Sequence, residues 1–214
     1  MLTNELVTAL PEAEVTATDL NTAMVEFGSR QAPGAEWRQA DALDLPFNND
    51  RFDLVACQFG AMFFPDKLAA FAEVRRVLAP GGALLLSTWG DVGTHGFAAA
   101  LVAGIQRAFP DDPPAFVATV PHGYFDLDRV VADLAAGGLG DLSTETVTLD
   151  GHADSAVGVA AGFCTGTPLR IEMAARGDLA AGTRAVAAEM KALLGDGPVT
   201  AAPMTAYVVE ARPS

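Results

Sequence analysis

The feature that most constrains the fold is a pair of apolar runs, at residues 52–57 and 83–89, with a helical pattern between them. In that pattern Leu68 and Phe71 begin one apolar face, and Pro-Gly-Gly at residues 80–82 ends it. Continuous apolar runs are typical of strands buried on both faces of a parallel sheet. Because parallel neighbours need a crossover connection, usually a helix, the sequence predicts an α/β fold.

The alternation of strand and helix patterns continues on both sides of this unit. Upstream, the end of a helix is expected at residues 3–10, a strand at 15–18 and a helix at 22–28. Downstream we expect helices at 97–109, 125–138, 155–163 and 179–194, and strands at 144–149 and 205–210. The whole chain, 1–214, is predicted to be a single domain. Segments 90–124 and 153–176 are predicted to be insertions that cover a substrate.

Two aspartates stand 22 residues apart, Asp19 and Asp41, each where a strand is expected to end. Ligands of doubly wound sheets bind at the carboxyl ends of the strands, where an acidic side chain accepts hydrogen bonds from ribose hydroxyls. The pair therefore indicates the adenosine half of a nucleotide-type site. A helix cap for Asp19 and a loop carboxylate for Asp41 are the structural alternatives.

Composition excludes several classes of function. The 214 residues include 27 acidic and 13 basic ones, a net charge of −14, which would repel nucleic acid. The two cysteines, Cys57 and Cys164, are too few for a disulfide framework. No run approaches the ~18 apolar residues that span a bilayer, and the N-terminus lacks the basic start of a signal peptide. We therefore expect a cytoplasmic protein without nucleic-acid or membrane partners.

Four segments, read in order, carry a resemblance to a known family: VTATDLN at 15–21, ADA at 40–42, RFDLV at 51–55 and LAPGGALLL at 78–86. With this order and spacing the chain resembles the class I S-adenosylmethionine-dependent methyltransferases, in their small-molecule branch. The resemblance implies a Rossmann-like sheet, mostly parallel, that ends in an antiparallel hairpin. It also implies S-adenosyl-L-methionine as cofactor and methyl transfer to oxygen, nitrogen or carbon of a small-molecule acceptor.

The resemblance also implies roles for particular residues. Asp19 would bind the two ribose hydroxyls, and Asp41 would accept from the adenine amino group. The remaining cofactor contacts would come from the backbone of Ala42 and the side chains of Leu20, Met24, Leu43, Gln58 and Phe59. Aromatic side chains that could line the acceptor pocket are Phe63, Trp89 and Tyr124, although such residues more often belong to the core.

No residue is assigned as catalytic from the sequence. The donor brings an activated leaving group, so a general base is needed only for an acceptor that holds its proton tightly. His95 and His122, both in the segment 90–124, are the candidates, and His152 falls in an expected turn. No metal site is expected, because the chain has no Cys-x-x-Cys pair and no His-x-x-x-His.

One departure from the family concerns the start of the sheet. The family begins with an apolar strand and a glycine-rich loop, and nothing before Val15 supplies them. The first central strand is therefore expected to be missing. Its loss would leave backbone edges unpaired, or would pair the two flanking strands, which end at Asp19 and Cys57, directly with each other. A misassigned or truncated start, a strand supplied in trans (for example in a homodimer) and a loss of methyl transfer all stay open. The functional alternatives are a non-catalytic or cofactor-independent binding partner and an NAD-dependent oxidoreductase.

Overall fold

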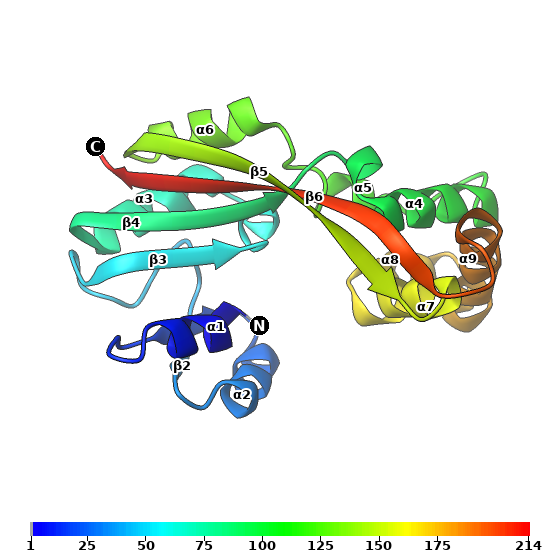
Figure 1. The fold of residues 1–214 in the computed structure, drawn as a ribbon, viewed down its shortest axis with the longest axis horizontal. Helices are drawn as coiled ribbons and strands as arrows, with labels where there is room; N and C mark the ends of the chain where they lie inside the picture. The colour runs from blue at the N-terminus through cyan, green and yellow to red at the C-terminus, as the bar shows by residue number, and fades with distance from the viewer. Residues whose placement is uncertain (1) are drawn as a thin grey trace.

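A computed structural model describes residues 2–214 as two β-sheets and a separate group of helices (Figure 1). The strands are β1 (Thr16–Asp19), β2 (Glu36–Gln39), β3 (Phe52–Gln58), β4 (Leu78–Trp89), β5 (Leu139–Ala153) and β6 (Val199–Pro213). The α-helices are α1 (Leu2–Ala9), α2 (Thr22–Gln31), α3 (Lys67–Val77), α4 (Gly96–Ala108), α5 (Phe116–Thr119), α6 (Leu127–Ala136), α7 (Ala156–Gly166), α8 (Leu169–Ala175) and α9 (Leu179–Leu194). Short 3-10 turns are η1 (Ala61–Phe63) and η2 (Val92–Thr94).

The strands form a parallel pair, β1-β2, and a four-stranded sheet in the order β3-β4-β6-β5. In the larger sheet β3 and β4 are parallel, whereas β6 is antiparallel to both β4 and β5. This confirms the predicted α/β fold with a C-terminal antiparallel hairpin. Within residues 2–214 no strand joins β1 to β3, so the expected gap takes the form of unpaired edges rather than a direct pairing of those two strands.

The β5-β6 hairpin is much longer than the strands predicted at 144–149 and 205–210, because each strand runs for 15 residues. Pairing extends from Leu139↔Pro213 to Ala153↔Val199, with irregularities that bend the ladder. Near the bend, a Cβ on Gly151 would lie 2.6 Å from the Phe97 ring, so only glycine permits this approach. In Figure 1 the hairpin leaves the sheet and reaches the helices at the far end of the molecule.

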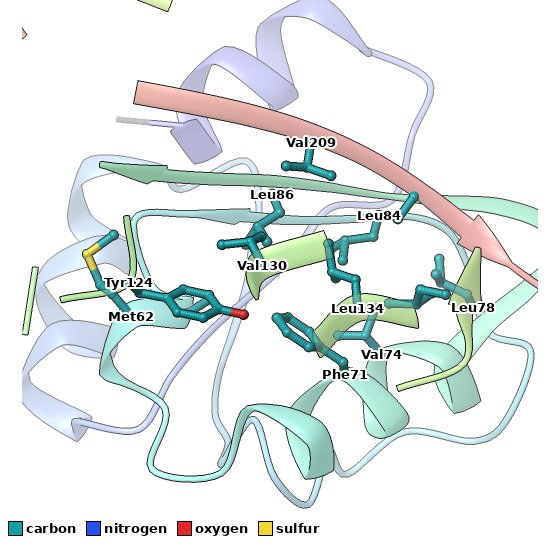
Figure 2. Packing of buried hydrophobic residues seen from close by; sticks show 13 residues of the cluster. Met62, Phe71, Val74, Leu78, Leu84, Leu86, Tyr124, Val130, Leu134 and Val209 are labelled. Atoms are coloured by element: carbon teal, nitrogen blue, oxygen red, sulfur yellow. The ribbon is translucent and has the colours of Figure 1, made fainter. Parts of the chain in front are cut away.

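The main core lies between the four-stranded sheet and helices α3 and α6 (Figure 2). Its almost fully buried members include Phe71, Leu78, Leu84, Leu86, Leu134 and Leu139. Helix α3 passes directly into β4, which begins at Leu78 rather than at the predicted residue 83. The earlier start follows from the pairing of Phe52 with Leu78, which precedes a bulge. The buried face of α3 is formed by Ala70, Phe71, Val74 and Val77. The predicted face was right for Phe71 but wrong for Leu68, which is 48% exposed.

The helices beyond β4 form a second core of their own, which we call the helical lobe: α4, α5, α7, α8 and α9. Leu101, Ile105, Met173, Val186 and Met190 are buried at its centre. The lobe thus combines the segments 90–124 and 153–176 with α9. Helix α8 was not predicted; Pro168, which precedes it, is read more readily as a turn than as a helix start. No helix within residues 2–214 is long and apolar enough to cross a membrane.

Candidate functional site

Asp19 and Asp41 lie together at the carboxyl ends of the parallel strands β1 and β2. Asp19 is the last residue of β1 and is in register with Gln39, two positions before Asp41. The N–H of Ala40 donates to the Asp19 carbonyl over 3.1 Å. This bond extends the β1-β2 pairing by one residue, to the residue before Asp41. We call this group the aspartate edge: Asp19, Leu20, Met24, Asp41, Ala42 and Leu43.

At the aspartate edge each carboxylate uses one oxygen to fix its own loop. Oδ1 of Asp19 accepts from the N–H of Asn21 over 2.8 Å, and Oδ1 of Asp41 accepts from the N–H of Leu43 over 2.9 Å. Both side chains are otherwise exposed, so their second oxygens are open to a ligand. Leu20 and Met24 are 65% and 49% exposed. Contact of these apolar side chains with water is unfavourable, and a flat ligand that covered them would remove it.

This arrangement fits the adenosine part of S-adenosylmethionine. Open carboxylate oxygens match ribose hydroxyls and the adenine amino group, which are donors, and exposed apolar side chains match the faces of a purine. The backbone N–H of Ala42 makes no hydrogen bond to another described residue, so it too is open to a ring nitrogen. Asp19 and Asp41 thus follow neighbouring parallel strands, and Leu20, Met24, Ala42 and Leu43 follow them closely in the chain; their role in cofactor binding stays a prediction.

Arg76 of α3 fixes the loop that follows the aspartate edge. Its guanidinium donates to the carbonyls of Phe47 (2.7 Å) and Leu45 (2.9 Å) and to Oδ1 of Asn49 (3.0 Å). The same group forms a bidentate ion pair with Glu73, whose carboxylate also accepts from the N–H of Leu45 over 2.8 Å. The hydrogen bonds from Arg76 hold the pKa of Glu73 below its ordinary value. Both side chains were absent from the predicted site.

A second group of side chains lies at the carboxyl ends of β3 and β4. The Phe59 ring stacks on Trp89 with centroids 3.8 Å apart, and His95 meets Trp89 edge-on at 4.9 Å. His122 lies 5.2 Å from His95, with the two rings nearly perpendicular. We call these four residues the aromatic box. Phe59 has φ of 54°, a left-handed conformation that is unfavourable for a bulky residue and that concentrates at functional sites.

The two histidines of the box are held in opposite tautomers. Nδ1 of His95 accepts from the N–H of Ala98 over 3.3 Å, which places the ring proton on Nε2. Nδ1 of His122 lies 2.9 Å from the carbonyl of Gly90 and must donate to it, which leaves Nε2 without a proton. Burial, with a smaller contribution from His122, lowers the pKa of His95 to about 4. Burial also lowers the pKa of His122, so both rings are neutral at pH 7.

An apolar hollow of about 200 Å³ lies between η1, α5 and the end of α7. Phe63, from the turn after β3, faces Phe116 across it with ring centroids 6.4 Å apart. Val117, Pro121 and Phe163 also line the hollow. Of the residues predicted to contact an acceptor, Phe63 therefore lines a hollow and Trp89 belongs to the box.

Tyr124 lies elsewhere, in the main core. It is 2% exposed, its hydroxyl donates to Asp133 over 2.9 Å, and Figure 2 shows its ring among the core side chains beside Met62. Burial and Asp133 raise the pKa of Tyr124 far above its ordinary value. Its prediction as a pocket residue is therefore not supported by the geometry: the hydroxyl group needs an internal partner, and Asp133 provides it.

Gln58 ends β3, in register with Ser87 of β4, and its side chain is exposed. Oγ of Ser87 is the one side-chain nitrogen or oxygen that is both enclosed and unpartnered among the described residues. A buried polar atom without a hydrogen-bond partner destabilises the folded protein. Ser87 is paired with Gln58, which is one of the predicted cofactor contacts. Neither Ser87 nor the loop role of Arg76 carries a signal in the sequence. Only the Glu73-Arg76 spacing, three positions on a helix, suggests an ion pair.

Comparison with known proteins points to methyltransferases. A family described as "methyltransferase domain" matches residues 2–86. Demethylmenaquinone methyltransferase from Staphylococcus aureus is 40% identical over 75 residues, which are 34% of this chain and 31% of that protein. The chain thus matches less than a third of the length of this curated relative.

Solved structures resemble nearly the whole chain. A S-adenosylmethionine-dependent methyltransferase from Methanosarcina mazei has a TM-score of 0.56 at 14% identity, with 97% of this chain and 86% of that chain covered. Phosphoethanolamine N-methyltransferase 2 from Haemonchus contortus, solved with phosphomonomethylethanolamine and S-adenosylhomocysteine, has a TM-score of 0.53 at 14% identity, covering 98% and 46%. Residues 2–86 therefore match the methyltransferase-domain family, and nearly the whole chain has the fold of the S-adenosylmethionine-dependent methyltransferases.

Proposed function

We propose that this protein transfers a methyl group from S-adenosylmethionine to a small-molecule acceptor. The observation that carries the proposal is the aspartate edge: two carboxylates with open oxygens at the ends of adjacent parallel strands, flanked by exposed Leu20 and Met24. A donor bound there would direct its methionine part along the sheet edge, toward Gln58 and Phe59. S-Adenosylmethionine supplies an activated methyl group when bound, so the protein's tasks are to align the reactants and to exclude water.

The residues divide these tasks between them. Asp19 and Asp41 bind the ribose and the adenine, while Leu20, Met24 and Leu43 cover the ring faces. The Phe59-Trp89 stack, with centroids 3.8 Å apart, forms an apolar wall next to the reacting atoms. The apolar hollow lined by Phe63 and Phe116 holds the acceptor. Its volume of about 200 Å³ is below the range of pockets for drug-sized ligands, which favours an acceptor of about one ring.

The gap in the sheet bears on how the site is completed. β1 and β3 each present an edge without a strand partner among residues 2–214, and a polar hollow of about 210 Å³ lies between Thr16, Arg38 and Arg51 near the amino ends of these strands. We propose that a strand supplied in trans, in a homodimer or by another partner, pairs with these edges and tightens donor binding. A monomeric molecular mass for the native protein, measured by light scattering, would contradict this.

Neither alternative function has comparable support. The family model and the relatives described above are methyltransferases, and a purely structural role would not require open carboxylates beside exposed apolar side chains. We place the activity in the cytoplasm, which is consistent with two free thiols, Cys57 and Cys164.

The test is transfer of a labelled methyl group from S-adenosylmethionine to a panel of phenols, amines and activated carbon acids. We expect product with the wild-type protein in its native assembly, and at least about a hundredfold less with Asp19→Ala. Asp111→Ala, in an exposed loop, is the matched control and should be unchanged. Equal rates for Asp19→Ala and the wild type would contradict the proposed use of the aspartate edge.

A further inference from the structure

We infer that His122 accepts a proton from an acceptor hydroxyl and that His95 is its positioning partner, which makes the acceptor an ionisable alcohol of the phenol type. The inference rests on the proposed function and deepens it. It starts from the fixed tautomers: Nδ1 of His122 is committed to the Gly90 carbonyl at 2.9 Å, so the lone pair on Nε2 is the free group of that ring.

The free nitrogen of each ring is accessible. Nε2 of His95 and Nε2 of His122 make no hydrogen bond to residues 2–214. Among residues 2–214, Oγ of Ser87 is the only side-chain nitrogen or oxygen that is both inaccessible to solvent and without a hydrogen-bond partner. Because the two Nε2 atoms also lack a partner, each of them must have some solvent-accessible surface. Side chains that are only 5% and 4% exposed, yet each with a free nitrogen, are suited to a ligand rather than to bulk water.

The surroundings connect this pair to the end of β3 and, through the backbone, to the acceptor hollow. Trp89 contacts both histidines, at 4.9 Å and 6.2 Å between ring centroids, and stacks on Phe59 at the end of β3. On the other side, the N–H of His122 donates to the carbonyl of Val117 over 3.2 Å. Val117 and Pro121, the residue before His122, line the hollow. A ring seated in the hollow would thus border the loop that carries His122.

The chemistry requires a base whose proton is absent at neutral pH. The groups that influence His122 are His95, the Gly90 carbonyl and Asp91; burial outweighs the last two and keeps the ring neutral. In the transfer, the acceptor oxygen bonds to the methyl carbon and the carbon–sulfur bond of the donor breaks, its electron pair staying on sulfur. The hydroxyl proton passes to Nε2 of His122 and then to water. His95, with its proton on Nε2, would donate a hydrogen bond to the same oxygen and orient it.

A phenol is the acceptor class that fits these features. The hollow is lined by apolar and aromatic side chains, which favours a flat ring, and an aliphatic alcohol is too weak an acid for a neutral imidazole. An aliphatic amine is protonated at neutral pH and would bring a charged group into a hollow lined mainly by apolar side chains. The hydroxyl of a phenol combines a ring for the hollow with a proton that the imidazole can remove.

The first experiment observes the histidines directly by long-range proton-nitrogen NMR, with ¹⁵N-histidine protein and S-adenosylhomocysteine present. We expect His122 protonated on Nδ1 and His95 on Nε2. Phenol should shift the Nε2 signal of His122 several-fold more than either nitrogen of exposed His152, whereas anisole, which has the ring but no proton, should not. Reversed tautomers, or equal shifts at His122 and His152, would overturn the inference.

The second experiment separates the base from the donor site. Calorimetry should give unchanged S-adenosylhomocysteine binding for His122→Gln, with His152→Gln as control. With phenol, His122→Gln should lower kcat by about 10²-fold with little change in KM. With 4-nitrophenol, which ionises without help, the loss should be under about tenfold. Equal losses for both acceptors would overturn the role of His122. Failure of the wild type to bind S-adenosylhomocysteine would instead contradict the proposed function.

Discussion

The buried His95 predicts a specific dependence of stability on pH. Burial and the neighbouring His122 lower the pKa of His95 from 6.5 to about 4 in the folded protein. In the unfolded chain the same imidazole takes up a proton below its ordinary pKa. The folded state therefore binds fewer protons between these values, and its free energy of unfolding falls as the pH falls from about 6.5 to about 4.

The size of the effect follows from the difference between the two pKa values. A shift of one pKa unit corresponds to 1.36 kcal/mol, so His95 alone accounts for a loss of about 3 kcal/mol between pH 6.5 and pH 4. The lowered pKa of His122 acts in the same direction, while Asp91 opposes it there. Carboxylates titrate in the same range, but a difference between two variants removes their contribution.

The assay is urea unfolding followed by circular dichroism at half-unit steps from pH 4 to pH 8. His95→Asn keeps an oxygen that can accept from the N–H of Ala98, so the start of α4 remains capped. Relative to the wild type, this variant should gain about 3 kcal/mol as the pH falls through the window, whatever its stability at pH 8. His152→Asn should parallel the wild type. Parallel curves for His95→Asn and the wild type would refute the buried, neutral histidine.

Two further predictions concern the walls of the site. A double-mutant cycle with Phe59→Leu and Trp89→Leu should give a coupling of about 1 kcal/mol in urea unfolding, because the rings stack at 3.8 Å; a coupling under about 0.3 kcal/mol would contradict a stabilising stack. Arg76→Lys keeps a charge but loses the planar fork that donates to Phe47, Leu45 and Glu73. We expect faster hydrogen exchange at residues 41–51 and about tenfold weaker S-adenosylhomocysteine binding. Arg75→Lys is the neighbouring control, and equal effects of both variants would contradict the loop role.

Much of the fold could be predicted from local pattern. The runs around Leu54 and Leu86 and the stripe of α3 have the periods of buried strands and an amphipathic helix, and the structure forms them at these places. The lengths of β5 and β6 could not be predicted. Their outer halves, such as Gly151 opposite Ala202, gain strand conformation from pairing with each other and from Phe97 in the helical lobe.

Of the two halves of the candidate site, the aspartate edge could be predicted from the sequence and the aromatic box could not. The aspartate edge could be predicted because its residues follow directly on two strands, so chain position alone brings Asp19 and Asp41 together. The aromatic box depends on segments far apart in the sequence: Phe59 and Trp89 end different strands, and His122 is placed by a hydrogen bond to Gly90. Tyr124, two residues later, turns into the core because Asp133 satisfies its hydroxyl. The sequence pattern around these two residues does not indicate that His122 joins the aromatic box while Tyr124 enters the main core.

Binding of the adenosine part of the donor at the aspartate edge can be measured by calorimetric titration of S-adenosylhomocysteine into the native protein. We expect saturable binding that weakens at least about tenfold in Asp19→Asn, because the amide replaces one of two charged acceptor oxygens by a donor. Asp111→Asn should bind as the wild type does. No binding by the wild type, or equal affinity for wild type and Asp19→Asn, would contradict the account.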